Sequence, residues 1–425
     1  MQRDNLSILD ILVEKTLTSS VPFPLAKTAV IYIHHALQTS LSLLKAQFKL
    51  GLAPQHTFVL NKHYSECSRV VEDIKNLGIH YQPCSPQVGL GKFSHSFTHD
   101  INLLWSQVIA SKEPINQMII MDHGGYALTF IPQQILDKYS VVGIEKTSAG
   151  LADGHLHCLP FPIIETASCA AKKILESPLI AEAIVTKLTP LIPFQKNITC
   201  GVIGHGAIGK ALTEKLLSMG HQVIVYDKDF NQRKKVKGAL VTNELSVAIA
   251  FADCIFGCTG QNIVTSIDLF RLCPNNKTLI SCSSEDKEFL SLIQYIQHKR
   301  NQNTTVKPLS DVVYKNDLGA TIHIVRGGFP VNFDDSGESV PRKDIELTRA
   351  LVLGSTLQAV NFLKMPSLLK QGGLYMLDPK LQQFVVNEWL KIQPQARFSK
   401  DIRQKFQDEC WIARHSGGIY NPGPE

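Results

Sequence analysis

The apolar positions of the chain follow two patterns that alternate through its first part. Short apolar runs stand at residues 29–34 (AVIYIH), 57–61 (TFVLN) and 117–122 (QMIIMD), and each is followed by a longer stretch with helical spacing. Apolar runs of this length predict buried strands. Strands that alternate with helices predict a parallel sheet with helices on its faces.

A second series of the same kind begins near residue 197. Its apolar runs are ITCGVIG, HQVIVYD, ALVTN, DCIFGCTG and TLISCSS, each followed by a helical pattern, which predicts a complete doubly wound set. Residues 319–333 (GATIHIVRGGFPVNF) predict a late strand or hairpin, and helices are expected at 344–363 and 378–390. The fold class is therefore α/β, with two doubly wound, Rossmann-like domains.

Length and composition agree with a folded chain of more than one domain. At 425 residues the chain is too long for one ordinary core, and we place the boundary within residues 177–196. Its 43 basic and 37 acidic residues are spread along the chain, which argues against nucleic acid as the main partner. No apolar run is long enough to cross a bilayer. Ten scattered cysteines without a CxxC pair indicate a reduced, cytoplasmic protein, and we expect no metal site.

The strongest motif is GVIGHGAIGK, which follows a predicted strand and opens a helix. It supplies Gly204, Gly206 and Gly209 as G-x-G-x-x-G, with Ala207 and Ile208 between the last two glycines. The glycines allow the tight turn, the close approach of backbone to a pyrophosphate and the packing of helix on strand.

The next predicted strand ends in Asp227, at the distance expected for an acid that binds the ribose 2′-hydroxyl of NAD. NADP is the alternative cofactor, because Lys228, Arg233, Lys234 and Lys235 follow and could meet a 2′-phosphate. Asp227 would repel that phosphate at short range, so we favour NAD.

Residues 162–177 read PIIETASCAAKKILES and place Lys172 and Glu176 four residues apart. On a helix this spacing brings the two side chains together on one face. Taken alone, the pair is either an exposed salt bridge or a catalytic lysine and carboxylate.

Several short motifs occur in one order along nearly the whole chain: HHALQTS, MDHGGYAL, EKTSAG, AAKKILES, GCTGQ and GGFPVNF. With these motifs around the NAD domain, the chain resembles the S-adenosylhomocysteine hydrolases. The resemblance implies a substrate domain at 1–180 that continues, as helices, at 339–392. It further implies an inserted NAD-binding domain at 181–338 and a C-terminal tail at 393–425. We also expect a homo-oligomer, a dimer or a tetramer.

Those enzymes use bound NAD to oxidise a ribose hydroxyl transiently, and the resemblance implies a matching set of residues. Lys172 and Glu176 align with the catalytic lysine and carboxylate, which can orient a hydroxyl and accept its proton. The remaining aligned positions are implied to bind the cofactor, and they are Thr147, Ser148, Thr259, Gly260 and Asn332.

The departures from the family pattern gather on the substrate side. His34 matches a family histidine, but Gln38 replaces a glutamate and Ser177 an asparagine. His123 stands where the family has an aspartate, which leaves Asp122 as the only acid of that motif, and Lys146 replaces another glutamate. Exchanging acids for lysine and histidine makes the expected substrate-binding surface basic, which favours a phosphate or carboxylate on the substrate.

We therefore predict an NAD-dependent enzyme that oxidises a hydroxyl of a small-molecule substrate, of the nucleoside or sugar type and bearing an anionic group. The expected catalytic residues are His34, Asp122, His123, Lys172 and Glu176, and the expected substrate-binding residues are Gln38, Lys146 and Ser177. The alternatives are a genuine S-adenosylhomocysteine hydrolase and, in another class, an NAD-binding pseudoenzyme or sensor.

Overall fold

The computed structural model describes residues 7–18, 23–85, 91–111, 114–152, 154–190, 197–299, 309–393 and 398–415. The chain forms two compact units. The first comprises residues 1–85, 97–176 and 335–425, and the second comprises residues 86–96 and 177–334. Each unit has one seven-stranded sheet with helices packed against it, which confirms the α/β class and the two doubly wound folds expected from the sequence.

The sheet of the first unit is entirely parallel, with the strand order β14-β6-β5-β4-β1-β2-β3. Its strands are β1 (Thr28–His34), β2 (Thr57–Asn61), β3 (His80–Gln82), β4 (Gln117–Asp122), β5 (Ser140–Glu145), β6 (Pro162–Glu165) and β14 (Gly373–Met376). The chain winds outward from β1 to β3 and then returns to β4 on the other side of β1. The order therefore reverses between β1 and β4, and open α/β sheets bind ligands at the carboxyl ends of the strands at such a point.

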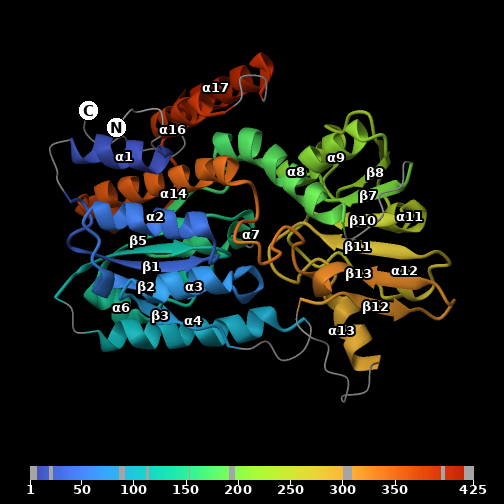
Figure 1. Ribbon diagram of the computed structural model, residues 1–425, viewed down its shortest axis with the longest axis horizontal. Helices are drawn as coiled ribbons and strands as arrows, with labels where there is room; N and C mark the ends of the chain where they lie inside the picture. Colours follow the sequence, from blue (N-terminus) through green and yellow to red (C-terminus); the bar gives the residue numbers. More distant parts are fainter. Residues whose placement is uncertain are drawn as a thin grey trace. The chain divides into compact units, whose positions relative to one another are not determined.

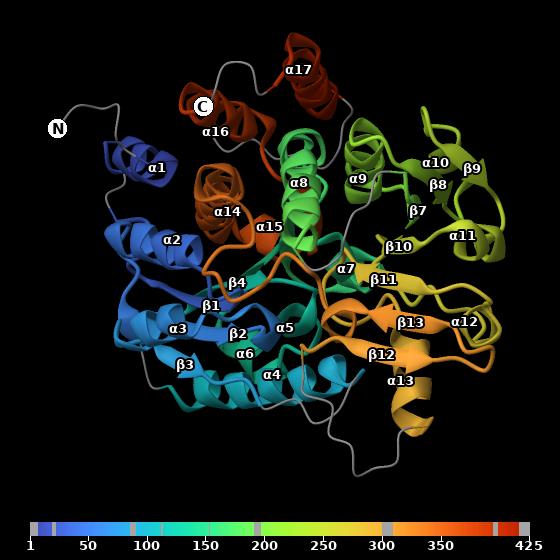
Figure 2. The same ribbon diagram turned by 45° about the vertical axis from the view of Figure 1, so that its right-hand side comes forward.

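Helices cover both faces of this sheet: α2 and α14 lie on one side, and α4 lies on the other (Figures 1 and 2). The helices are α1 (Ile8–Leu17), α2 (Gln38–Lys49), α3 (Ser68–Lys75), α4 (Phe93–Ala110), α5 (Tyr126–Thr129), α6 (Gln133–Lys138), α7 (Ser148–Leu151), α14 (Arg342–Leu363), α15 (Pro366–Leu369), α16 (Pro379–Lys391) and α17 (Lys400–His415). Helix α14 packs against α1, α2, α16 and β5, so nearly all of its side chains are buried, polar ones included.

The second unit has the sheet order β12-β13-β11-β10-β7-β8-β9. Its strands are β7 (Thr199–Ile203), β8 (Gln222–Tyr226), β9 (Leu240–Thr242), β10 (Cys254–Gly257), β11 (Lys277–Ser281), β12 (Val312–Lys315) and β13 (Thr321–Ile324). Its helices are α8 (Ser177–Leu188), α9 (Ala207–Ser218), α10 (Phe230–Arg233), α11 (Leu245–Phe251), α12 (Asp268–Arg271) and α13 (Leu290–Lys299). One core cluster joins the sheet to α8 and α9, and another joins it to α11, α12 and α13 (Figure 2).

Shorter turns complete the two units. They are the 3₁₀ turns η2 (Pro54–His56), η3 (His63–Ser65), η4 (His155–Cys158) and η6 (Val325–Gly328), and a π-helical turn, η5 (Lys172–Glu176). In the described part of the chain, no helix has both the length and the apolar character needed to span a membrane.

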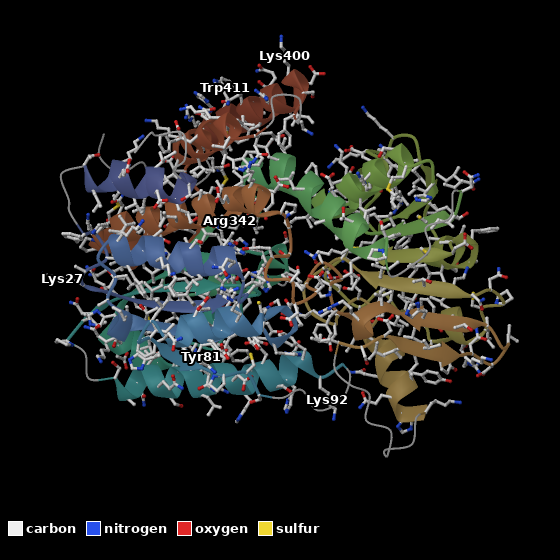
Figure 3. All side chains as sticks on the ribbon, in the orientation of Figure 1. Lys27, Tyr81, Lys92, Arg342, Lys400 and Trp411 are labelled. Atoms are coloured by element: carbon white, nitrogen blue, oxygen red, sulfur yellow. The ribbon has the colours of Figure 1, made fainter. Side chains whose placement is uncertain are left out.

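Of the late strand or hairpin expected at residues 319–333, the structure has one strand, β13, which pairs antiparallel with β12 just before that range. Two details differ from the expected pattern. Residues 339–392, expected to be helical, also contribute β14, which is only four residues long and lacks an alternating pattern. The segment expected to be a polar tail contains helix α17, which buries Phe406 and Cys410 and exposes Trp411 (Figure 3). The end of that tail, residues 416–425, lies outside the described residues.

Candidate functional site

The turn after β7 leaves room for a phosphate. Gly204 has a left-handed φ of 95°, and Gly206 is the N-cap of α9. A Cβ atom built on Gly206 meets no atom within 4 Å, whereas one on Gly209 would lie 1.8 Å from the carbonyl oxygen of Gly204. The first turn of α9, which begins with Ala207 and Ile208, therefore directs its backbone N–H groups into open space. This arrangement suits a pyrophosphate.

Asp227 follows β8 and joins two turns at the same edge of the sheet. Its carboxylate accepts hydrogen bonds from the backbone N–H groups of His205 at 2.6 Å and Asp229 at 2.8 Å. A carboxylate has about four lone-pair sites, so Asp227 keeps acceptor capacity for ribose hydroxyls. The Arg233 guanidinium donates to the carbonyls of Asp227 and Lys228 at 2.6 and 3.1 Å, so it is engaged with backbone.

The turn after β10 is held by Glu288, a residue that the sequence analysis did not select. The buried Glu288 carboxylate accepts hydrogen bonds from the backbone N–H groups of Thr259 and Gly260 and from the Thr259 hydroxyl, at 2.6 to 2.8 Å. Burial raises the pKa of Glu288. The expected cofactor residues Thr259 and Gly260 thus lie at the order reversal between β7 and β10 in the second unit.

In the first unit, three histidines lie at the order reversal between β1 and β4. His34 ends β1, and its ring is buried with both nitrogens lacking a hydrogen-bond partner among the described residues. The Nε2 atom of His35 lies 3.2 Å from Nε2 of His123, and its Nδ1 atom lies 2.5 Å from the hydroxyl of Ser65. Burial lowers the pKa of all three histidines, so they are neutral near pH 7.

Two carboxylates hold the loops around these histidines. Asp122 accepts hydrogen bonds from the backbone N–H groups of His123 at 2.6 Å and Leu128 at 2.8 Å, and burial raises its pKa. Glu145 accepts from the N–H groups of Gly124, Gly125 and Thr147 and from the Thr147 hydroxyl, at 2.6 to 3.1 Å. The structure thus gives Asp122 a role in shaping the turn.

Basic side chains surround His34. The Lys146 ammonium donates a hydrogen bond to the carbonyl of Ile33 at 2.8 Å, and burial lowers the pKa of Lys146 to about 7. The buried Arg349 donates from Nε to the Thr39 hydroxyl at 3.1 Å, and Thr39 in turn donates to Glu338. Burial and, after it, the positive charges of Lys146 and Arg349 lower the pKa of His34.

Lys172 and Glu176 meet as the sequence spacing suggested, but on a π-helical turn. The Lys172 ammonium lies 3.6 Å from the Glu176 carboxylate and donates to the carbonyl of Lys146 at 2.9 Å. The other Glu176 oxygen accepts from the Thr348 hydroxyl at 2.7 Å. Neither side chain is exposed, so the pair is not a surface salt bridge. π-Helical turns are frequently found at functional sites.

The remaining expected site residues are spread over both units. Gln38, the first residue of α2, is exposed, and Ser177 begins α8 in the second unit. Thr147 is the N-cap of α7, with Ser148 as the first helical residue. Asn332 is buried in the second unit. The structure therefore brings together His34, Asp122, His123, Lys146, Lys172 and Glu176 in the first unit. Gln38 donates its backbone N–H to the carbonyl of Gly337.

Several residues of this site escaped the sequence analysis. Arg349 and Thr348 lie within a helix that was predicted from its apolar residues. A signal for Arg349 was available, because it is a cation at a position that the helical spacing assigns to the core. Ser65 and Glu288 carry no local signal, because their partners are distant in the sequence. His35 was not selected either, although it directly follows His34 in the sequence. Within the described residues, no cluster of three or more histidine, cysteine or acidic side chains is arranged to hold a metal ion.

Residues 187–267 match the family described as the NAD-binding domain of D-isomer specific 2-hydroxyacid dehydrogenases. The match spans β7 to β10 and includes Gly204, Gly206, Gly209 and Asp227. Together with the open glycine turn, it identifies a nicotinamide dinucleotide as the cofactor.

Two curated relatives are sequences from Mycobacterium tuberculosis, strains CDC 1551 and H37Rv, each described as an uncharacterized protein. Each is 30% identical over 342 residues, which covers 78% of this chain and 64% of the relative. The chain thus spans less than two thirds of the length of these relatives.

Two solved structures that are similar to this chain are both of an NADPH-dependent glyoxylate/hydroxypyruvate reductase from Sinorhizobium meliloti. The complex with NADP and malonate has a TM-score of 0.42 and 10% identity and covers 77% of this chain and 92% of that chain. The complex with citrate has a TM-score of 0.37 and 11% identity and covers 59% and 83%. Likeness at this level does not extend to function.

The match to dehydrogenases overturns the resemblance to S-adenosylhomocysteine hydrolases, which was wrong. The short motifs misled because several of them are turns at the carboxyl ends of strands, where different dinucleotide-dependent folds need similar residues. Hydrolase chemistry loses its support. NAD-dependent oxidation of a hydroxyl is the part of the hypothesis that remains.

Proposed function

We propose that the chain is an oxidoreductase that uses NAD to oxidise the hydroxyl of a small anionic substrate of the 2-hydroxy acid class, or to reduce the corresponding ketone. The unit containing residues 177–334 is proposed to hold the cofactor, and the other unit the substrate. The dehydrogenase match supports the cofactor half of this proposal.

The proposal rests mainly on one observation, the buried and unpaired ring of His34. Its ring is 4% exposed and neither nitrogen has a hydrogen-bond partner among the described residues. An unpaired buried polar group costs roughly 1–3 kcal/mol, so the fold tolerates a cost that a bound ligand would offset. The cations Lys146 and Arg349 act on the same ring. A ligand with a hydroxyl or carbonyl oxygen and a negative charge matches both requirements.

Lys172 and Glu176 are proposed to position the reacting oxygen. Lys172 is tied to the carbonyl of Lys146 just after β5, and its positive charge can stabilise negative charge on a substrate oxygen. Glu176 keeps Lys172 oriented from one side while Thr348 fixes the carboxylate. The group that exchanges the hydroxyl proton is one of the neutral histidines at the reversal point.

NAD is proposed in preference to NADP. Asp227 lies at the end of β8 and keeps acceptor capacity for ribose hydroxyls, whereas it would repel a 2′-phosphate. The nearby cations have partners of their own: Arg233 binds backbone carbonyls, Lys234 lies 4.3 Å from the Phe230 ring centroid, and Lys235 donates to Gln232.

The test is to follow the absorbance of reduced nicotinamide when the full chain is mixed with NAD and a panel of hydroxy compounds. The panel pairs each 2-hydroxy acid with its neutral amide and includes sugar phosphates as a second anionic class. We expect turnover with the hydroxy acids and at least a tenfold higher KM for the amides. Cofactor that binds but is not reduced by any hydroxy compound, and not oxidised by the ketones, would contradict the proposal and indicate a dinucleotide-binding protein without turnover.

Arg349→Met and Arg342→Met form a matched pair of variants on α14. Arg349 is buried beside Thr39, whereas Arg342 is largely exposed at the start of the same helix (Figure 3). We expect Arg349→Met to raise the KM for anionic substrates and Arg342→Met to leave it unchanged. Equal effects of the two changes on KM would show that Arg349 does not bind the anion.

A further inference from the structure

A short chain of hydrogen bonds connects Ser65 to His123 through His35. The Ser65 hydroxyl lies 2.5 Å from Nδ1 of His35 and 2.9 Å from the carbonyl oxygen of Lys62. Nε2 of His35 lies 3.2 Å from Nε2 of His123. These side chains follow β1, β2 and β4, so three neighbouring strands of the sheet deliver them to one point.

The protons of this hydrogen-bonded chain from Ser65 to His123 can be arranged in two ways. In the first, the Ser65 hydroxyl donates to the Lys62 carbonyl, Nδ1–H of His35 donates to Ser65, and Nε2–H of His123 donates to His35. In the second, Ser65 donates to Nδ1 of His35, and Nε2–H of His35 donates to His123. Both arrangements need one proton on each ring, which agrees with the lowered pKa of His35 and of His123.

The first arrangement satisfies more groups. It makes three hydrogen bonds among these atoms, whereas the second makes two and leaves the Ser65 hydroxyl accepting none. The Lys62 carbonyl accepts the backbone N–H of Ser65 at 3.0 Å in either arrangement. The buried Ser65 hydroxyl accepts a hydrogen bond in the first arrangement and none in the second, and a missing bond to a buried group is not replaced by water. One additional hydrogen bond of ordinary strength favours the first arrangement roughly 2- to 10-fold.

We infer that His123 carries its proton on Nε2 and presents the lone pair of Nδ1 as the base for the substrate hydroxyl, with Ser65 as the positioning residue that selects this tautomer through His35. The Nδ1 atom has no hydrogen-bond partner among the described residues, and it is not among the fully enclosed polar atoms, so a ligand can reach it. His123 itself is half-buried.

The role as a base rests on the proposed function. NAD⁺, when bound, would supply the two-electron oxidant that accepts the carbon-bound hydrogen with its electron pair. His123 would take the hydroxyl proton on Nδ1 as the alcohol becomes a ketone, and the imidazolium ring would then pass this proton to water. In the reverse direction, His123 starts protonated and donates to the carbonyl oxygen.

The tautomer is tested directly by nitrogen NMR of the full chain with ¹⁵N-labelled histidine, because protonated and bare ring nitrogens have well separated shifts. His123→Gln identifies the signals of His123 by their loss. In the unsubstituted chain at pH 7 we expect a protonated Nε2 and a bare Nδ1 on His123, and a protonated Nδ1 on His35. A proton on Nδ1 of His123, or a doubly protonated His123 ring, would overturn the inference.

Three serine variants test the positioning role. Ser65→Ala should reduce the tautomer preference of His123 from roughly 2- to 10-fold to about equal populations, and Ser65→Thr, which keeps the hydroxyl, should restore it. Ser106→Ala is the matched control, because Ser106 is exposed and its hydroxyl donates to the carbonyl of Asn102 in its own helix. Unchanged His123 shifts in folded Ser65→Ala protein would show that Ser65 does not set the tautomer.

The outcomes also separate this inference from the proposed function. A bare Nδ1 on His123 in a protein that turns over no hydroxy compound would leave the tautomer assignment standing while the proposed function fails. Turnover by a protein whose His123 carries its proton on Nδ1 would support the proposed function while the tautomer assignment fails.

Discussion

The ammonium group of Lys172 donates a hydrogen bond to the backbone carbonyl of Lys146, 2.9 Å away. This bond joins the π-helical turn to the end of β5, because Lys146 directly follows that strand. Lys172 is therefore held at the carboxyl edge of the sheet by backbone, and its ion pair with Glu176 at 3.6 Å is a secondary restraint. A lysine fixed in this way can serve a ligand at the edge of the sheet.

Lys172→Met should lower kcat for the proposed oxidation by roughly a hundredfold to a thousandfold, the usual cost of removing one donor to a reacting oxygen. Lys173→Met is the control, since Lys173 is exposed beside it. Steady-state rates with the best hydroxy acid measure both. If the two variants are equally active, Lys172 has no part in the reaction.

Gly206→Ala and Gly209→Ala should separate cofactor binding from folding. Gly206 has a φ of −69°, and a Cβ there meets no protein atom within 4 Å, so Gly206→Ala should fold normally. The added methyl would occupy the space of the pyrophosphate and should weaken NAD binding at least tenfold. Calorimetric titration with NAD measures this change.

Gly209→Ala should instead destabilise the fold, because its Cβ would lie 1.8 Å from the Gly204 carbonyl oxygen. Thermal unfolding without cofactor is the measurement, and a melting temperature lower by several degrees is expected. Normal NAD affinity in the Gly206→Ala variant would show that the pyrophosphate does not lie at this turn.

Asp227→Ala should relax the preference for NAD over NADP. Removing the carboxylate loses charged hydrogen bonds to the ribose, worth roughly 1.5–3 kcal/mol, and removes repulsion of a 2′-phosphate. Asp227→Asn keeps one acceptor oxygen, and so one of the two hydrogen bonds from the N–H groups of His205 and Asp229, and serves as a control of similar size. Unmodified protein that binds NADP more tightly than NAD would contradict the assignment.

The affinity for an anionic substrate should fall as the pH rises through about 7. Burial lowers the pKa of Lys146 to about 7, while Glu145 and Asp122 act to raise it and Arg349 and Lys172 to lower it further. An anion binds the protonated lysine best, so affinity is greatest below this pKa and decreases up to about tenfold per pH unit above it.

Binding titrations of a 2-hydroxy acid from pH 6 to 9 measure this dependence. Lys146→Met should abolish most of it and should bind the anion weakly at every pH. A neutral amide of the same substrate provides the control, because its affinity has no reason to follow the charge of Lys146. Identical pH profiles for the acid and the amide would exclude Lys146 as the anion-binding group.

Strands, helices and the dinucleotide turn could be predicted from local patterns. Gly204, Gly206 and Gly209 sit between two apolar strands, and the long helix of residues 342–363 showed itself as a continuous apolar pattern. Strand β14 could not be found this way, because four residues are too few to show a period. The pairing of Lys172 with Glu176 followed from their spacing, although the turn that carries them is π-helical.

The substrate side of the site depended on contacts between distant residues. Ser65 meets His35 across 30 positions, and Arg349 meets Thr39 across 310 positions. No local pattern marks such partners. The roles of Asp122 and Glu145 as acceptors of backbone N–H groups were also hidden, because a carboxylate after a strand looks the same in sequence whether it serves a loop or a ligand.

The two sheets share the order of their first five strands. From one edge they run β3-β2-β1-β4-β5-β6-β14 and β9-β8-β7-β10-β11-β13-β12, so the two units have the same winding up to β5 and β11. They differ beyond that point, because β13 lies next to β11 and the preceding strand β12 pairs antiparallel at the edge. His34 and Gly204 then occupy corresponding places, at and just after the end of the first strand. The same winding supports two kinds of anion recognition: one by backbone N–H groups exposed at a glycine turn, the other, as we propose, by basic side chains. A comparison of the two units position by position therefore indicates how one winding can serve both the cofactor site and the substrate site that we propose.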